Sequence, residues 1–256
     1  MVILLDEHLQ APMFFFLRNL SMVDILCTSV TLPKLLDVIL TGDNRISYVA
    51  CLSQLYFLIS MLCTEIFLLT AMSYDRYVAI CHPLHYVLLM GRRKCFQLVA
   101  SCWILGCSNS ILLTFFASTL DFCRSRNINN MFCDMKILTM LSCGNIKKFE
   151  MIIYVEAFLL GLCPFLLILI SYSKIIVSIL KIHSTGQRSK TFSTCTSHLI
   201  VLLIFYGTLF CVYMRPISEN SEKFDLIFSV FYIAVTPTLN PLIYSLKNKA
   251  IKVAIR

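Results

Sequence analysis

Long apolar runs separated by short polar segments dominate the chain. Crossing the hydrocarbon core of a bilayer takes ~20 helical residues, and each run reaches or exceeds that length. The runs lie at residues 13–40, 48–80, 96–117, 149–180, 193–214 and 224–246. Residues 1–11 are too short to span a bilayer, and Asp6 and Glu7 follow their apolar start too soon for a signal peptide. The pattern predicts an all-α, multi-span transmembrane bundle with six spans.

Composition supports the same class. Hydrophobic residues make up 58% of the chain and charged residues 14%, with a mean hydropathy of +0.80. A soluble domain is about half apolar and a quarter charged, so this chain is not built to face water on all sides. The net charge of +8 comes from basic residues in short segments between apolar runs. We therefore expect membrane lipid, and not nucleic acid, as the partner of this surface.

Lysine and arginine set the expected orientation. Three segments that flank the spans carry basic residues and, apart from Asp75, no acid: Arg92, Arg93 and Lys94; Lys174, Lys181, Arg188 and Lys190; Lys247, Lys249, Lys252 and Arg256. The positive-inside rule places these segments in the cytoplasm, together with the C-terminus. Residues 118–148 then form an external loop, and residues 247–256 form a short cytoplasmic helix or tail.

The predicted side of the membrane divides the 13 cysteines into two groups. Cys123, Cys133 and Cys143 lie in the predicted external loop, and Cys51 opens the second span on the same side. Four thiols on the oxidising face predict two disulfides, for which sequence alone leaves three pairings open. The other cysteines lie in spans or on the reducing side, where we interpret them as small apolar packing residues.

Acidic residues inside spans carry more information. Asp24, Glu65 and Glu156 each lie within an apolar run, where an ionisable group costs several kcal/mol unless it is paired, hydrated or protonated. Asn240 in the last span is a polar residue that could partner them. One interpretation is a protonated carboxyl that hydrogen-bonds between helices. The other is a functional site.

Other classes of function find less support. A transporter usually shows paired half-repeats or a polar stripe, and neither is evident. Ser197 and His198 are adjacent on a helix and point in different directions, and no acid is spaced to orient the histidine, so we expect no enzyme and no catalytic residues. His82 and His85 stand beside prolines with no Cys-x-x-Cys nearby, so we expect no metal site there.

The most informative stretch is residues 73–86, which read SYDRYVAICHPLHY. An acid and an arginine stand side by side where hydrocarbon gives way to water, and Pro83 ends the helix. This stretch resembles the cytoplasmic end of the third helix of olfactory receptors, a family of rhodopsin-like (class A) G-protein-coupled receptors. Further stretches that resemble the family lie in order along the chain at residues 12–24, 30–36, 171–172, 190–199, 205–208 and 237–249.

The resemblance implies one seven-transmembrane-receptor-type domain over residues 1–256. Its function would be to bind a small volatile odorant and to activate a stimulatory heterotrimeric G protein, in the plasma membrane of olfactory sensory neurons. It implies the pairings Cys51–Cys133 and Cys123–Cys143. The implied switch and G-protein coupling residues are Asp75, Arg76, Tyr77, Tyr172, Asn240, Pro241 and Tyr244. The implied ligand contacts are Leu58, Ile59, Leu62, Cys63, Glu156, Leu160, Tyr206, Phe210, Tyr213 and Ile233.

The resemblance also bears on ions and on the start of the chain. Asp24 and Glu65 match positions that line an internal cation pocket in rhodopsin-like receptors, which implies a sodium ion there and no other cofactor. Family members carry an external tail and a first helix before the position of Pro12, so we expect an N-terminally truncated receptor that lacks helix one. The alternatives are a truncated product that does not signal and, with less support, a membrane transporter.

Overall fold

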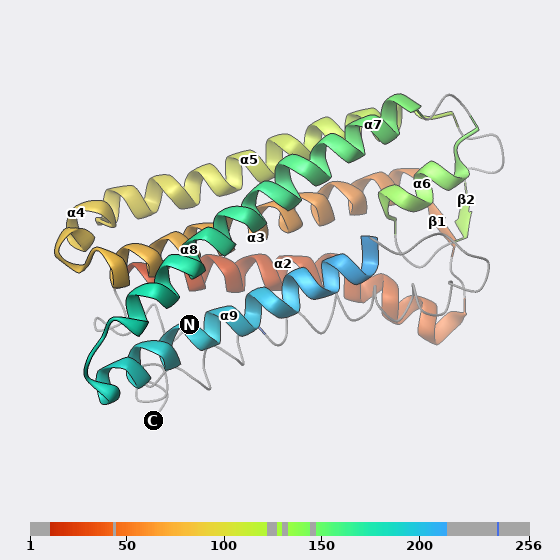
Figure 1. The fold of residues 1–256 in the computed structure, drawn as a ribbon. Coiled ribbons are helices and arrows are strands. Elements are labelled where there is room, and N and C mark those ends of the chain that lie inside the picture. Colours follow the sequence, from red (N-terminus) through yellow and green to blue (C-terminus); the bar gives the residue numbers. More distant parts are fainter. Residues whose placement is uncertain are drawn as a thin grey trace.

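The computed structural model describes residues 11–42, 45–121, 127–129, 133–143, 147–213 and 240. Figure 1 shows an elongated bundle whose long helices run the length of the molecule, with α3 between its neighbours. The long helical elements are α2 (Pro12–Thr41), α3 (Tyr48–Cys81), α5 (Arg92–Ser118), the continuous α7 (Lys147–Glu156), η3 (Ala157–Leu162) and α8 (Cys163–Leu180), and α9 (Thr185–Tyr213).

Within the described residues, four helices are long and apolar enough to cross a membrane. They cover Tyr48–Cys81, Arg92–Ser118, Lys147–Leu180 and Thr185–Cys211. The first predicted span corresponds to α2, which is 30 residues long but is not among these four. The last predicted span, at residues 224–246, lies outside the described residues apart from Asn240. The expected multi-span helical fold is confirmed.

Local signals explain where the helices begin and end. Pro12 occupies the first turn of α2, where a missing N–H costs nothing, and Gly42 caps its end with a φ of 71°. Ser47 caps α3 by accepting a hydrogen bond from the backbone N–H of Ala50 at 3.3 Å. Pro83 stops α3 and opens η2 (Pro83–His85), which leads into α4 (Tyr86–Leu89). The predicted second span therefore matches α3 closely.

The end of the bundle at the predicted external loop, called the outer end below, contains more regular structure than a polar loop would suggest, and the opposite end, at α4, is called the inner end. β1 (Arg45–Ser47) pairs antiparallel with β2 (Asn127–Asn129), with Ile46 opposite Ile128. α6 (Met135–Leu141) follows, and its first N–H is capped by the Asp134 carboxylate at 2.6 Å. Figure 1 places β1, β2 and α6 at the end opposite to α4.

The fourth and fifth predicted spans differ in detail from the structure. The fourth run contains Pro164, a residue that usually interrupts a helix, yet α7, η3 and α8 are continuous, and Pro164 lies in the first turn of α8 after a π-helical stretch. A proline removes one backbone donor, and the wider π turn absorbs that loss without breaking the helix. α9 begins at Thr185 and not near residue 193, because polar residues continue the helix beyond the apolar run.

Buried side chains form two clusters along α3. One fills the centre and inner half of the bundle between α2, α3, α8 and α9, with Phe16, Leu68 and Phe205 fully buried. The other surrounds Cys51 and Cys133 at the outer end. Many large apolar side chains on α5 and α7–α8 are exposed, among them Ile104 and Tyr154. Exposed apolar helix faces of this kind suit contact with lipid.

Gly106 allows α5 to approach α3 closely. A Cβ at this position would overlap Thr64 Oγ1 and lie 2.9 Å from the Ser60 carbonyl oxygen. We expect Gly106→Ala to lower the free energy of unfolding by about 1–3 kcal/mol because the two helices must separate. The thermal unfolding midpoint in detergent micelles measures this effect. Gly207→Ala is the matched control, since nothing lies within 4 Å of a Cβ there, and equal midpoints for the two variants would contradict the prediction.

Candidate functional site

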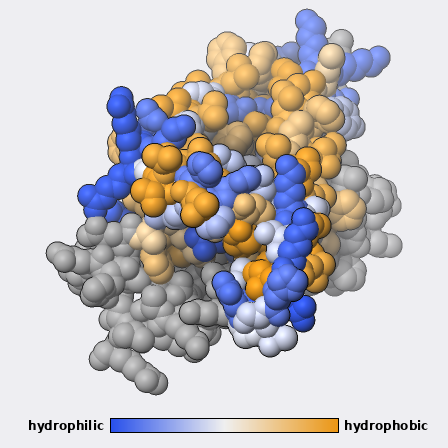
Figure 2. Space-filling model, turned by 60° about the vertical axis from the view of Figure 1, so that its left-hand side comes forward, coloured by the Kyte–Doolittle hydropathy of each residue, from blue (hydrophilic) through white to orange (hydrophobic). Residues whose placement is uncertain are grey.

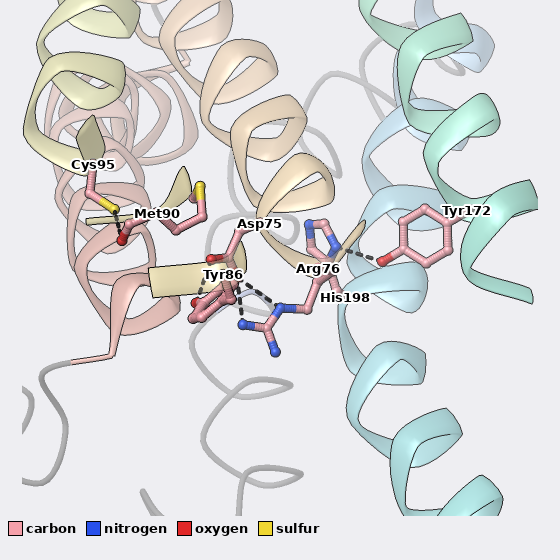
Figure 3. A network of polar contacts seen from close by, with 7 residues as sticks. All are labelled: Asp75, Arg76, Tyr86, Met90, Cys95, Tyr172 and His198. Atoms are coloured by element: carbon pink, nitrogen blue, oxygen red, sulfur yellow. Dashed lines mark hydrogen bonds and ion pairs between the residues drawn. The ribbon is translucent and has the colours of Figure 1, made fainter. Parts of the chain in front are cut away.

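An ion pair at the inner end of α3 anchors the first candidate site (Figure 3). Arg76 donates from Nε to Asp75 Oδ2 at 2.9 Å, and its Nη2 bonds the same oxygen. Tyr86 donates its hydroxyl to the other oxygen, Asp75 Oδ1, at 2.8 Å. The turn that Pro83 imposes brings Tyr86 back under α3. Because Asp75 is fully buried, both of its carboxylate oxygens need hydrogen-bond partners, and Arg76 and Tyr86 supply them.

Burial and the neighbouring Asp75 carboxylate raise the pKa of the Tyr86 hydroxyl. Tyr86 therefore keeps its proton at physiological pH and remains a donor to Asp75. Close by, Cys95 donates from Sγ to the Met90 carbonyl at 3.3 Å, which fixes the start of α5 against α4.

Two further contacts join α8 to its neighbours at this end. Tyr172 on α8 and His198 on α9 form a buried hydrogen bond between Oη and Nδ1 at 2.6 Å (Figure 3). Lys174 Nζ lies 5.4 Å from the centroid of the Tyr77 ring, a cation–π contact between α8 and α3. The Tyr77 hydroxyl also bonds His82 Nε2 at 3.0 Å. The switch residues predicted on α3 and α8 thus lie near one another.

Long hydrophilic side chains stand out around hydrophobic ones where Figure 2 turns the α4 end of the bundle toward the viewer. The exposed basic residues that this end contributes are Arg92, Arg93, Lys94, Lys174, Lys181 and Arg188. These six basic residues of the predicted cytoplasmic segments therefore gather at the same end as the Asp75–Arg76 pair.

A second polar site lies in the middle of the bundle. Asn240 donates from Nδ2 to Asp24 Oδ1 at 3.1 Å and to Glu65 Oε1 at 3.2 Å. All three residues are buried, although they are far apart in the sequence. Asp24 Oδ2 has no hydrogen-bond partner among the described residues. Two buried carboxyls that share one amide need a proton or a cation between them, because like charges this close cannot both stay bare.

The outer half of the bundle holds most of the predicted ligand contacts. Ile59 and Cys63 are buried in the outer cluster, Leu160 packs against it, and Leu58 and Leu62 pack against the central cluster. Glu156 ends α7, and its Oε1 is buried without a hydrogen-bond partner in the described part of the chain.

The remaining predicted ligand contacts are three residues of α9 and Ile233, and they differ in how far the structure describes them. Tyr206 packs its ring against Phe165, 4.9 Å between centroids, and its buried hydroxyl has no hydrogen-bond partner among the residues described. Phe210 is 63% exposed, so it is not enclosed by the described helices. Tyr213 is the last residue of α9 and its side chain lies outside the description, as does Ile233.

Cys51 and Cys133 form a disulfide that ties the outer end of α3 to the external segment. Cys143 is disulfide-bonded as well, and Cys123, its predicted partner, lies outside the described residues. Gln54 adds a second link beside the Cys51–Cys133 disulfide, since its side-chain oxygen accepts a hydrogen bond from the Cys133 backbone N–H at 3.0 Å. The predicted switch residues Pro241 and Tyr244 lie outside the residues that the structure describes.

Several residues of these sites were not among the predicted site residues, and Tyr86, His198 and Asn109 are examples. Tyr86 and His198 belong to stretches that resemble the family, at 73–86 and 190–199, so the signal was present in the sequence. Asn109 gave no such signal. It reaches Cys63 across helices, with Nδ2 3.4 Å from Sγ, and only the packing of α5 on α3 reveals that contact.

Comparison with known proteins agrees with this geometry. The sequence profile described as olfactory receptor matches residues 1–256. Olfactory receptor 1G1 of Gorilla gorilla gorilla is 46% identical over 256 residues, which is 100% of this chain and 82% of that protein. Olfactory receptor 1J1 of Homo sapiens is 45% identical over 256 residues, covering 100% and 80%. Olfactory receptor 1E16 of Mus musculus is 45% identical over 254 residues, covering 99% and 81%.

These matches cover the chain from end to end, including α2 to α9 and the residues of both polar sites. The apolar helices agree with a multi-pass membrane protein. With the profile matched over all 256 residues and relatives at 45–46% identity, the chain belongs to the olfactory receptor family.

Proposed function

We propose that this chain is an odorant receptor that couples the binding of a small volatile ligand to a stimulatory heterotrimeric G protein. The observation that carries the proposal is the inner network, in which Arg76 is held by Asp75 while Tyr172 and His198 join α8 to α9. These buried contacts lie beside the exposed basic surface, an arrangement that suits a conformational switch recognised by a cytoplasmic partner. The proposed place is the plasma membrane of olfactory sensory neurons, with the C-terminus cytoplasmic.

The ligand would bind between the outer halves of the helices. Small-molecule sites have mostly apolar walls and a few polar groups that set orientation. The predicted apolar contacts Leu58, Ile59, Leu62, Cys63 and Leu160 supply such walls, with Tyr206, Phe210, Tyr213 and Ile233 as the further predicted contacts. Glu156 Oε1 and the Tyr206 hydroxyl, which have no hydrogen-bond partner within the described part of the chain, supply polar groups.

Activation requires that the odorant bind one arrangement of the helices more tightly than the other. In the arrangement described, Arg76 points its guanidinium at Asp75 and is not available to a partner. Movement of α8 and α9 relative to α3 would change the Tyr172–His198 and Lys174–Tyr77 contacts. Release of Arg76 would then expose a cation within the basic surface. Tyr77, Asn240, Pro241 and Tyr244 complete the proposed switch.

The central polar site fits a sodium ion by its chemistry. Asp24 and Glu65 offer hard carboxylate oxygens, and Asp24 Oδ2 has no protein partner among the described residues. A bound sodium ion would supply the positive charge that two buried carboxyls lack. Asn240, from the last predicted span, would hold both carboxyls in place and so link α2 to α3.

Arg76→Leu tests the coupling half of the proposal. We expect the variant to reach the cell surface and to lose the odorant-induced rise in cyclic AMP, because the cation that the partner reads is gone. The measurement compares cyclic AMP in cells that express the chain with a stimulatory olfactory-type G protein, across an odorant panel.

Lys34→Leu is the control, since it removes a cation on α2 that pairs with Asp37, away from the network. An Arg76→Leu variant that signals like the unaltered chain would contradict the proposed switch. A surface-expressed chain that no odorant activates would contradict the proposed function itself.

A further inference from the structure

Glu156 lies where three helices meet in the outer half of the bundle. The Asn109 side chain of α5 lies beside its carboxyl, and Cys63 of α3 is close enough to interact with its charge. Asn109 itself donates to Cys63 Sγ at 3.4 Å, so its position is fixed. The structure leaves Glu156 Oε1 buried and, within the described residues, without a hydrogen-bond partner. A buried carboxyl oxygen of this kind needs a donor.

Among the residues that the structure describes, α3, α5 and α7 place no cation near Glu156. The only basic residue of α3 is Arg76, and those of α5 are Arg92, Arg93 and Lys94, all at the inner end. On its own helix, Lys148 lies two turns earlier, ~12 Å along the axis, and is exposed. An ion pair needs about 4 Å, so these side chains do not neutralise the carboxyl. The missing donor must come from outside this group of residues.

Several apolar side chains of the described helices belong to the clusters around Glu156. Leu160 follows one turn later and packs against the outer cluster, where Ile59 and Cys63 are buried. Leu62 lies beside Cys63 on α3 and packs against the central cluster. A molecule that met both the carboxyl and these walls would have a hydrocarbon body and one donor group at its end. Acceptor-only groups, such as an aldehyde, would leave Glu156 unpaired, and a carboxylate would repel it.

We propose that Glu156 sets the ligand class of this chain, and that the site selects a small apolar amine over aldehydes and carboxylic acids of the same hydrocarbon length. The inference rests on the proposed odorant-binding function and deepens it. An amine brings both the hydrogen-bond donor and the positive charge that the site lacks. Charge-assisted hydrogen bonds in apolar sites are among the strongest, so discrimination of about tenfold or more is expected.

Hexylamine, hexanal and hexanoic acid test this because they share one hydrocarbon chain and differ in the head group. We expect hexylamine to act at a concentration at least about tenfold lower than the other two. Glu156→Gln keeps the shape of the side chain and removes its charge. It should weaken the response to hexylamine by about tenfold or more and leave hexanal equal or improved, because the new amide can donate.

Glu150→Gln is the matched control, since it makes the same change on the same helix, in the first turn of α7. Surface amounts of all variants are measured by an external epitope. Binding is also read without the G protein, as a rise in the thermal unfolding midpoint of the purified chain on addition of each compound. This second readout separates binding from coupling.

The outcomes distinguish the two proposals. Equal potency of hexanal and hexylamine, or an unchanged hexylamine response in Glu156→Gln, would overturn the inference and leave the odorant receptor proposal standing. Stabilisation by hexylamine without any cyclic AMP response would support the inference and contradict the coupling. A surface-delivered chain that none of the three compounds stabilises or activates would overturn the inference.

Discussion

Cys133→Ser is expected to abolish delivery of the chain to the cell surface. The Cys51–Cys133 disulfide closes a loop with a sequence separation of 82, and it is fully buried in the outer cluster with Ile59 and Cys63. Loss of a native disulfide typically costs about 2–5 kcal/mol, because the unfolded chain gains the freedom that the link removes. Flow cytometry with an external epitope, compared with total protein, measures the surface fraction.

Cys211→Ser is the control for this experiment, since Cys211 is a free and exposed cysteine of α9. We expect its surface fraction to equal that of the unaltered chain. If Cys133→Ser also reached the surface in normal amount, the disulfide would not be needed to hold the external segment on α3. Gln54 and the apolar cluster would then hold that segment without it.

Asn240→Leu is expected to cause the second large effect, by leaving two buried carboxyls without their shared donor. Each unsatisfied buried polar group costs about 1–3 kcal/mol, so the pair predicts a loss of about 2–6 kcal/mol in the free energy of unfolding. The thermal unfolding midpoint in detergent, followed by the reactivity of the buried cysteines with a thiol dye, measures this loss.

A double variant identifies the cause. Adding Asp24→Asn to Asn240→Leu returns an amide to the site and removes one of the two acids, so part of the lost stability should come back. Asn19→Leu is the matched control, because the partners of Asn19 among the described residues are neutral groups, the Phe15 carbonyl at 2.9 Å and the Trp103 indole at 3.3 Å. If the loss of stability in the double variant equalled the sum of the losses in Asp24→Asn and Asn240→Leu, Asn240 would act through packing and not through the carboxyls.

The parts of the fold that sequence predicted well are those with local causes. α3 begins and ends where Ser47 and Pro83 signal it, and apolar runs marked α5 and the α7–α8 helix to within a few residues. The pairing of β1 with β2 joins three-residue strands about eighty residues apart, which no local pattern indicates. The start of α9 was misplaced because hydropathy reports the membrane and not the helix, which continues into water.

In the candidate sites, too, residues with a local signal were predicted, and contacts between distant residues were not. Asp24, Glu65 and Asn240 stood out because polar groups in apolar runs are costly, and the structure brings them together. His198 was considered only with its neighbour Ser197, whereas its hydrogen-bond partner is Tyr172, 26 residues away on another helix. Partnerships between helices depend on packing, and packing depends on close approaches such as that of Gly106.

The π-helical segment η3 controls which way Glu156 faces. Sixteen residues separate Glu156 from Tyr172 (172 − 156), and in an uninterrupted α-helix they would point ~160° apart around the axis. A π turn takes up about one extra residue, which reduces that angle to ~60°. If this segment became regular α-helix at unchanged length, the Glu156 carboxyl would therefore rotate by ~100° relative to Tyr172. Deletion of one residue together with a return to α-helix would keep the ~60° angle, so the way this segment is wound, and not its length alone, sets the direction of the carboxyl.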